Sequence, residues 1–229
     1  MEPRHHHAVP AGWWVGIAIG TLLVPGAVVL DRDLMAALRP HGQAGLVGLM
    51  GWVTWLGYGL VDIAIPLAIG LRAWWRADAA ALRRGLLGGL AVALAGILDQ
   101  LLKNLVCRAR PNAAAAGAFL AVFPCFPAPY ALASFPSGHA TTAFALATVL
   151  SLWYPKGWWA WAALAGLVGW SRIVLGSHFP SDVLAGAVLG CAVVLVCVRW
   201  WPGFTGTPGQ CKTDNREPTT ENRQPRTDQ

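Results

Sequence analysis

Two histidines and an aspartate have the types and spacing needed for nucleophilic catalysis. His178 precedes Asp182 by four residues, about one helical turn, in the stretch SRIVLGSHFPSD. An aspartate at this spacing can accept the ring N–H of the histidine, fix its tautomer and leave the other nitrogen free to attack an electrophile. His139 has no such carboxylate beside it. We therefore expect His178 to be a nucleophile and His139 to be a proton donor.

Three basic residues accompany these side chains. Lys103 and Arg110 lie seven residues apart in KNLVCRARP, nearly two helical turns, so both can point the same way. Arg172 comes six residues before His178. Three fixed cations require an anion, and the oxygens of a phosphate group match them well. The spacing thus favours a phosphate as the electrophile.

The stretch FPSGHA, residues 135 to 140, has the pattern of a helix start. Ser137 is a candidate N-cap, and Gly138 leaves the backbone free of a side chain. Backbone N–H groups at the start of a helix form an anion site. A helix that starts here would therefore present backbone N–H groups to an anion.

Each feature taken alone has a simpler structural explanation. A basic residue at the end of an apolar span can reach the membrane interface, and Pro-Ser-Gly is a common turn. Asp182 suits the first turn of a helix, with Ser181 as its cap. The combination favours catalysis, because the chain avoids charge elsewhere and ionisable groups in membrane bundles tend to be functional. No carboxylate cluster is available for magnesium or calcium, so we expect no metal and no cofactor.

The composition indicates a membrane protein. Of the 229 residues, 55% are hydrophobic and only 12% are charged, against about 25% in soluble domains. The net charge of +6 does not indicate nucleic-acid binding, because the basic residues sit beside apolar segments. We expect membrane lipids as the surroundings and no obligate protein partner.

Six apolar segments predict six transmembrane helices in one unit over residues 11–201. Strands that cross lipid alternate apolar and polar residues, and these segments do not alternate. Tryptophan pairs mark several of their ends, as expected at membrane interfaces. The segments are residues 11–30, about 44–71, 85 to about 106, 140–154, 157–170 and 183–198. Residues 1–10 form a short N-terminal segment, and residues 202–229 are polar and predicted to be disordered.

The distribution of basic residues predicts the orientation. Positive residues concentrate on the cytoplasmic side of membrane proteins. The loop after the second segment is basic, Lys156 follows the fourth, and more basic residues close the chain. Both termini are therefore predicted to be cytoplasmic. The four polar clusters, at the end of span three, the start of span four, the end of span five and the start of span six, then meet at the extracytoplasmic face.

Four further residues have environments that invite a prediction. Asp99 lies one turn before Lys103 and is placed to hold it. Cys107 and Cys125 flank one loop and can form a disulfide only if that loop faces an oxidising compartment. Asp62 is a charge inside an apolar segment, and the sequence names no partner for it.

KNLVCRARP, PSGH and SRIVLGSHFPSD resemble the three motifs of the type 2 phosphatidic acid phosphatase family, K-x6-RP, PSGH and SR-x5-H-x3-D. Every signature position matches over residues 103 to 182. The resemblance implies that His178 forms a phosphohistidine, oriented by Asp182, and that His139 protonates the leaving oxygen and then activates water. It also implies a metal-independent reaction in which the phosphoryl oxygens are held by Lys103, Arg110, Ser137, Gly138 and Arg172.

The resemblance implies an integral membrane phosphatase acting on lipid phosphates or diphosphates, in a bacterial inner membrane with its site facing the periplasm or exterior. Phosphatidic acid, phosphatidylglycerophosphate, undecaprenyl diphosphate and lipid A phosphates all remain open as substrates. A phosphotransferase using the same intermediate is the nearest alternative, and a non-catalytic binder or transporter of anionic lipids is another. Vanadium haloperoxidases have a similar site, but they are soluble, and six predicted spans argue against them.

Overall fold

The structure, a computed structural model, describes residues 10–39, 43–113, 116–119, 125–201 and 203–204. These residues form helices and loops without a strand, which confirms the predicted all-α class for this part of the chain. Eight α-helices are described: α1 (Ala11–Val29), α2 (Asp31–Leu38), α3 (Ala44–Val53), α4 (Gly59–Trp74), α5 (Ala79–Val106), α6 (Gly138–Trp153), α7 (Trp158–Val174) and α8 (Pro180–Trp200). Three 3-10 helices join them: η1 (Thr54–Gly57), η2 (Tyr130–Leu132) and η3 (Pro155–Gly157).

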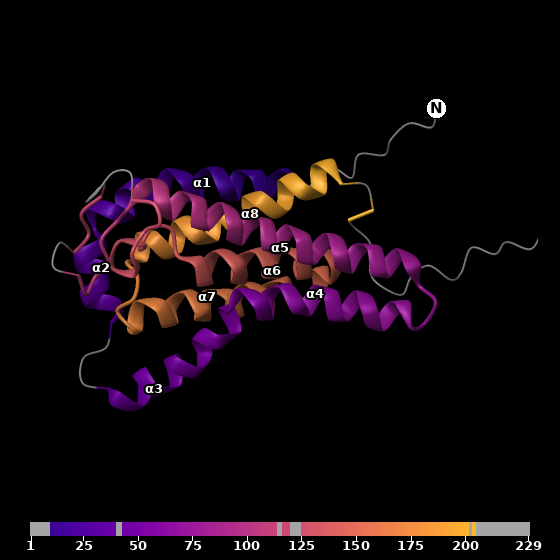
Figure 1. The fold of residues 1–229 in the computed structure, drawn as a ribbon, viewed down its shortest axis with the longest axis horizontal. Helices are drawn as coiled ribbons and strands as arrows, with labels where there is room; N and C mark the ends of the chain where they lie inside the picture. Colours follow the sequence, from indigo (N-terminus) through magenta and orange to yellow (C-terminus); the bar gives the residue numbers. More distant parts are fainter. Residues whose placement is uncertain (1–9, 40–42, 114–115, 120–124, 202, 205–229) are drawn as a thin grey trace, which may run out of the picture.

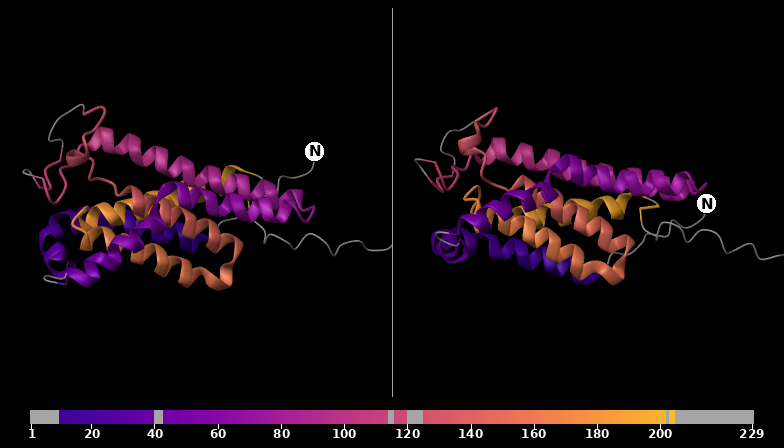
Figure 2. Two further views of the ribbon diagram at one scale, coloured as in Figure 1. Left: turned by 60° about the horizontal axis from the view of Figure 1, so that its bottom comes forward. Right: turned by 90° about the horizontal axis from the view of Figure 1, so that it is seen from below.

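The helices form an elongated bundle (Figure 1). α5 runs the length of the bundle beside α4, α1 lies along α8, and α6 lies in the middle, while α3 projects at the end that also holds α2. Two further views show the same side-by-side arrangement (Figure 2). The main core joins α5, α6 and α8 through buried residues such as Val92, Val149, Trp153 and Val194. Helices α5, α6 and α8 therefore form the rigid centre of the molecule.

Three helices, α1, α5 and α8, are long and apolar enough to cross a membrane. The bent pair formed by residues 44–57 and 59–74 would make a fourth. α6 has 16 residues and covers about 24 Å, less than the roughly 30 Å of a bilayer core. α7 has 17 residues. The helices are those of an integral membrane protein, and six spans stay a prediction.

The second apolar segment, predicted as one helix over about residues 44–71, is broken in the structure. Helix α3, the 3-10 helix η1 and α4 replace it, with a bend of 50°. Tyr58 has an extended backbone (φ −73°, ψ 119°), which interrupts the helical hydrogen bonds. Gly57 packs so closely that an added Cβ would lie 2.4 Å from Val168 and 3.0 Å from the carbonyl of His139. The chain is therefore broken where it meets α6 and α7.

The stretch SRIVLGSHFPSD consists of two helix ends and a short link, whereas the predicted segments ended at residue 170 and began again at residue 183. α7 continues to Val174, so Arg172 is helical, and α8 begins at Pro180. Proline suits the first position of a helix, because its missing N–H would have no partner there. Gly176 takes a left-handed conformation (φ +65°) that favours glycine. Only residues 175–179 form the link.

Helices α6 and α8 cross at two glycines, Gly186 and Gly190. A Cβ added at Gly190 would lie 2.2 Å from the carbonyl oxygen of Thr141, and one at Gly186 would lie 2.6 Å from that of Ser137. Small residues four apart allow this close backbone approach in lipid. The crossing brings the start of α8 against the start of α6, which is where the predicted site residues lie.

We expect Gly190→Ala to lower the thermal midpoint of the protein in detergent. The methyl group would meet backbone atoms of α6, and overpacking of this kind typically costs about 1–3 kcal/mol. Gly166→Ala is the matched control, because a Cβ there meets nothing within 4 Å. Size-exclusion chromatography after heating measures both variants. Equal midpoints for Gly190→Ala and wild type would show that the crossing tolerates a side chain.

Two predicted segments cannot be compared with the structure. Residues 1–9, most of the short N-terminal segment, and residues 205–229, most of the predicted disordered tail, lie outside the described residues.

Candidate active site

A cavity of about 590 Å³ opens at the end of the bundle where α5 ends and α6 begins. It collects residues from all three sequence motifs. The predicted site residues that line it are Asp99, Lys103, Arg110, Gly138, His139, Arg172 and His178. Two others, Ser137 and Asp182, are completely buried and do not line the cavity.

His178 presents one ring nitrogen toward the cavity. Its Nδ1 lies 2.8 Å from the backbone oxygen of Ser134, which can only accept, so Nδ1 carries the hydrogen. The lone pair is then on Nε2, which lies 3.4 Å from Nη1 of Arg110. This is the tautomer that a nucleophile needs.

Asp182 is not the acceptor of the His178 ring N–H that we had predicted. Its Oδ2 lies 3.7 Å from Nδ1, beyond hydrogen-bond range. The same oxygen accepts from the Ser134 hydroxyl at 2.6 Å and from the Phe179 N–H at 2.8 Å. The other oxygen, Oδ1, lies 2.5 Å from Nη1 of Arg108. Asp182 therefore acts on His178 as a nearby charge and through Ser134.

The surroundings of His178 keep its imidazole neutral. Burial lowers its pKa from 6.5 to about 4; the Asp182 carboxylate opposes this, and the positive charges of Arg110 and Arg172 add to it. At neutral pH the ring therefore has a free lone pair, and the side chain is only 2% exposed. A buried neutral histidine next to fixed cations is suited to attack a bound anion.

Three backbone carbonyls hold the Arg110 guanidinium in place. Nε donates to Tyr130 at 2.8 Å, Nη1 to Ser177 at 3.0 Å and Nη2 to Ala133 at 3.1 Å. The ring of Tyr130 lies 3.8 Å from the guanidinium carbon. The charge is therefore oriented before any substrate arrives, which is the arrangement that lowers the reorganisation cost of catalysis.

Arg172 is positioned by the break in the second apolar segment. Its Nη1 donates to Oγ1 of Thr54, in η1, at 2.7 Å. Its buried Nε has no hydrogen-bond partner among the described residues. A buried guanidinium N–H without a partner is costly, so this donor is available to an anion.

Lys103 and Asp99 form an ion pair one turn apart on α5, at the positions where we predicted that Asp99 holds the lysine. Asp99 also accepts from Oγ1 of Thr141 at 3.1 Å. An ammonium group has three donors, so Lys103 keeps others for a phosphate oxygen. Asp99 therefore fixes the position of the Lys103 ammonium group and offsets part of its positive charge.

The start of α6 completes the anion site. Ser137 is the N-cap residue, but its Oγ caps nothing and has no hydrogen-bond partner among the described residues. A Cβ on Gly138 would lie 3.0 Å from Asp99 Oδ2 and 3.3 Å from Lys103 Nζ. Glycine therefore lets the helix start approach the ion pair, whereas the buried Ser137 hydroxyl does not reach the cavity.

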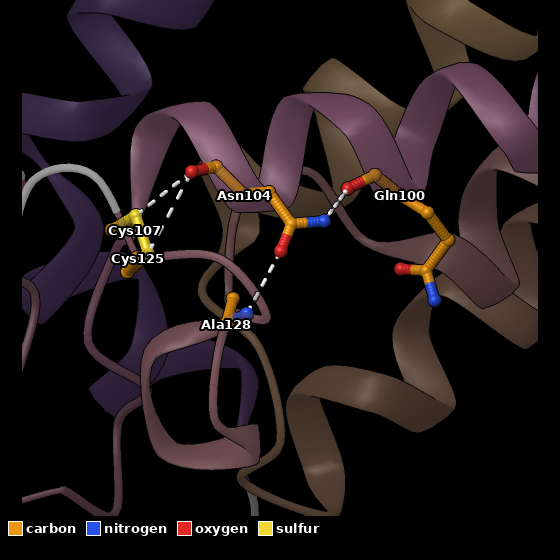
Figure 3. Close-up of a disulfide and its surroundings, with 5 residues drawn as sticks. All are labelled: Gln100, Asn104, Cys107, Cys125 and Ala128. Atoms are coloured by element: carbon orange, nitrogen blue, oxygen red, sulfur yellow. Dashed lines mark hydrogen bonds between the residues drawn. A yellow bond between two sulfur atoms is a disulfide. The ribbon is translucent and has the colours of Figure 1, made fainter.

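A disulfide joins Cys107, at the end of α5, to Cys125 (Figure 3). The carbonyl of Asn104 lies beside both sulfurs, and the Asn104 amide bonds the N–H of Ala128 at 2.8 Å and the carbonyl of Gln100 at 2.7 Å. The loop after α5 is thus tied back to the helix. Because Arg108 and Arg110 follow Cys107 directly, this link holds the segment that supplies both arginines.

Asp62 lies away from the site. It is buried on α4, both of its oxygens lack a hydrogen-bond partner among the described residues, and it lines a separate apolar cavity of about 270 Å³. The structure gives it no role in the chemistry. Within the described ranges, no three His, Cys, Asp or Glu side chains are grouped to hold a metal ion.

Sequence reasoning missed three contributors: Arg108, Ser134 and Thr54. Arg108 occupies one of the variable positions of the K-x6-RP motif and was not predicted to belong to the site. Ser134 acts on His178 through a backbone carbonyl, which leaves no signature in the residue type. Thr54 contacts Arg172 only because the helix breaks there, 118 residues away in the chain. Of the three, only Arg108 could have been found from the sequence, because it is a basic residue two positions before Arg110 in KNLVCRARP.

Curated relatives match parts of the chain. A lipid A 1-phosphatase of Rhizobium etli is 38% identical over 99 residues, which are 43% of this chain and 42% of that protein. A decaprenylphosphoryl-5-phosphoribose phosphatase of Mycobacterium tuberculosis is 36% identical over 111 residues, 48% of this chain and 58% of that protein. The chain thus matches less than two thirds of the length of these relatives.

Two solved structures have a similar fold. LpxE of Aquifex aeolicus aligns with a TM-score of 0.59 and 26% identity, covering 75% of this chain and 96% of LpxE. A transmembrane PAP2-type phosphatidylglycerolphosphate phosphatase of Bacillus subtilis aligns with a TM-score of 0.56 over 82% of this chain and 93% of its own; its 23% identity supports the fold alone.

The family model of the PAP2 superfamily matches residues 84–205, more than half of the chain and all three motifs. The predicted family resemblance is thereby confirmed, and the chain belongs to the PAP2 superfamily.

Proposed function

We propose that this protein is an integral membrane phosphatase that removes phosphate from lipid phosphates or diphosphates through a phosphohistidine intermediate. The observation that carries the proposal is the arrangement around Nε2 of His178. This unprotonated nitrogen shares one cavity with three cations and a second histidine. Binding an anion needs only the cations, whereas a neutral buried nucleophile beside a proton donor serves bond cleavage.

In the first step, Nε2 of His178 attacks phosphorus, and an N–P bond forms as the P–O bond to the lipid breaks. His139 gives its proton to the leaving oxygen, so the lipid departs as an alcohol or a monophosphate. Arg110, Arg172 and Lys103 neutralise the charge that builds on the phosphoryl oxygens.

In the second step, water attacks the phosphohistidine. His139 is now neutral and takes a proton from the water, the N–P bond breaks, and inorganic phosphate leaves. His178 returns to its neutral form with the hydrogen on Nδ1, held by the carbonyl of Ser134. His139 ends the second step holding the proton that it took from the water.

A lipid substrate is supported by the surroundings of the cavity. Exposed apolar side chains lie around it, and a soluble protein would not keep so many uncovered. Tyr58 and Tyr130 line the cavity, and Leu101, Leu105 and Phe126 are exposed neighbours in sequence of residues that line it. The relatives' names refer to lipid A and to a prenyl-linked phosphoribose. These observations support lipid phosphates as a class without selecting one.

We further propose that the site faces the extracytoplasmic side of a bacterial inner membrane. The basic loop between α4 and α5 lies at the opposite end of the bundle from the site, as the positive-inside rule requires (Figure 1). The Cys107–Cys125 disulfide also supports an oxidising surrounding for the site loop.

The test is phosphate release by the purified protein in detergent with EDTA present. The panel contains phosphatidic acid, phosphatidylglycerophosphate, undecaprenyl diphosphate and lipid A. We expect release from at least one of them and inhibition by vanadate, which binds where the phosphoryl group is transferred. Strict dependence on added metal, or binding of these lipids without release, would contradict the proposal. Release only when a second alcohol is supplied would identify a phosphotransferase.

A further inference from the structure

Arg108 lies behind the cavity, between two carboxylates. Its Nη1 is 2.5 Å from Oδ1 of Asp182 and 2.7 Å from Oγ of Ser181, and its Nη2 is 2.6 Å from Oδ2 of Asp31. The side chain is 2% exposed and does not line the cavity. Arg108 therefore contacts the support of the nucleophile but has no path to a bound substrate.

Asp31 fixes the other side of this arginine. It is the first residue of α2, is 3% exposed and accepts from the N–H of Ser181 at 2.9 Å and from its hydroxyl at 2.6 Å. Ser181 is the residue before Asp182. One carboxylate from the N-terminal part of the chain thus holds both the arginine and the first turn of α8.

Arg108 reaches Ser134 from two directions. Its own carbonyl accepts the Ser134 N–H at 3.1 Å. Its guanidinium holds Asp182, whose other oxygen accepts the Ser134 hydroxyl at 2.6 Å. The Ser134 carbonyl in turn accepts from Nδ1 of His178. A continuous set of hydrogen bonds therefore runs from Arg108 to the nucleophile.

The arginine is also shielded from water. Its guanidinium carbon lies 4.4 Å from the centre of the Phe119 ring and 4.5 Å from that of Phe179. Charged pairs in such surroundings interact strongly, and removing one partner leaves an uncompensated buried charge. Without Arg108, the Asp31 and Asp182 carboxylates would share the Ser181 region with no cation between them.

We propose that Arg108, held by Asp31, is a positioning residue that sets the orientation of His178 through Asp182 and Ser134. This inference rests on the phosphatase function proposed above. The forked guanidinium is required, because its two Nη atoms bind the two carboxylates at once. A lysine ammonium is a single point charge and cannot reproduce that geometry.

The experiment compares kcat, KM and thermal midpoint for wild type, Arg108→Lys, Arg108→Met and the double variant Asp31→Asn with Arg108→Met. The substrate is whichever lipid of the panel wild type hydrolyses best. Arg110→Lys is the matched control, because Arg110 lines the cavity and is two residues away. The double variant removes one charge of each sign, so the cluster keeps its net charge and only Asp182 is left without the arginine.

We expect the Arg108 variants to lose roughly 10- to 100-fold in kcat with little change in KM, as is usual for residues that orient a reactive group indirectly. Arg110→Lys should instead raise KM as well. The double variant should recover the thermal midpoint of wild type but not its kcat, because neutralising Asp31 restores charge balance without restoring the position of Asp182.

Wild-type kcat in folded Arg108→Lys, or recovered kcat in the double variant, would overturn the inference, since Arg108 would then serve charge balance alone. A raised KM with unchanged kcat in Arg108→Lys would overturn it too, by showing contact with substrate. An inactive wild type contradicts the phosphatase function itself, so failure of the function and failure of the inference are distinguishable.

Discussion

Replacing His178 by alanine is expected to lower phosphate release by at least about 10⁴-fold, the range seen when members of a catalytic triad are changed. Nε2 of His178 lies 3.4 Å from Nη1 of Arg110 in the cavity, and the other histidine there, His139, is assigned to proton transfer. Water would then have to attack the phosphate directly, with help only from the cations. The loss should appear in kcat, because Arg110 and Lys103 still bind the phosphate.

The measurement is phosphate release in detergent with EDTA, alongside trapping of the covalent intermediate from a labelled lipid phosphate. Wild type should carry an acid-labile label and His178→Ala should carry none. Ser177→Ala is the matched control, since Ser177 contacts Arg110 through its backbone carbonyl and its hydroxyl is not needed. A labelled, active His178→Ala protein would place the nucleophile elsewhere.

Replacing His139 by glutamine is expected to have an effect that depends on the leaving group. A lipid alkoxide must be protonated as it departs, and loss of a general acid typically costs about 10²- to 10⁴-fold. p-Nitrophenolate leaves without a proton, so transfer from p-nitrophenyl phosphate to His178 should survive. Hydrolysis of the phosphohistidine should remain slow, because the variant lacks the base, His139, that takes a proton from the attacking water. The variant should therefore release one equivalent of nitrophenol quickly and then stall.

Rapid-quench kinetics with both substrates test this. The stalled variant should hold phosphate on His178 in proportion to the nitrophenol released. Equal losses with the lipid and with p-nitrophenyl phosphate, and no trapped phosphohistidine, would show that His139 does not transfer protons. Lys103→Met provides a contrast, because loss of a cation should slow both substrates alike.

The sequence allowed the prediction of the residues that line the cavity, because their side chains carry the chemistry. Lys103, Arg110, His139, Arg172 and His178 are polar in apolar surroundings, and the positions of the segments bring them to one end. This inference needed only helix periodicity and the order of the spans. It did not require exact helix boundaries. The predicted end of the fifth segment at residue 170, four residues before the end of α7, therefore did not change the predicted set of site residues.

What could not be predicted depends on backbone geometry and distant pairing. Ser134 supports His178 through a carbonyl that every residue possesses. Arg108 pairs with Asp31 and Asp182, 77 and 74 residues away, and nothing in the local sequence indicates these partners. The bend before α4 lies where Gly57 packs closely against α6 and α7, a tertiary contact that local hydropathy does not report.

The break at η1 bears on how much of the chain is needed for an active protein, because η1 supplies a partner of Arg172. The recognisable family region begins at residue 84, yet Arg172 takes its partner from Thr54 and Arg108 takes one from Asp31. Two of the arginines in and behind the site are thus held by a part of the chain that carries none of the motifs. The motif region is therefore shorter than the unit needed for activity. A fragment that begins at residue 84 would keep the reactive side chains but lose Asp31 and Thr54, which position Arg108 and Arg172.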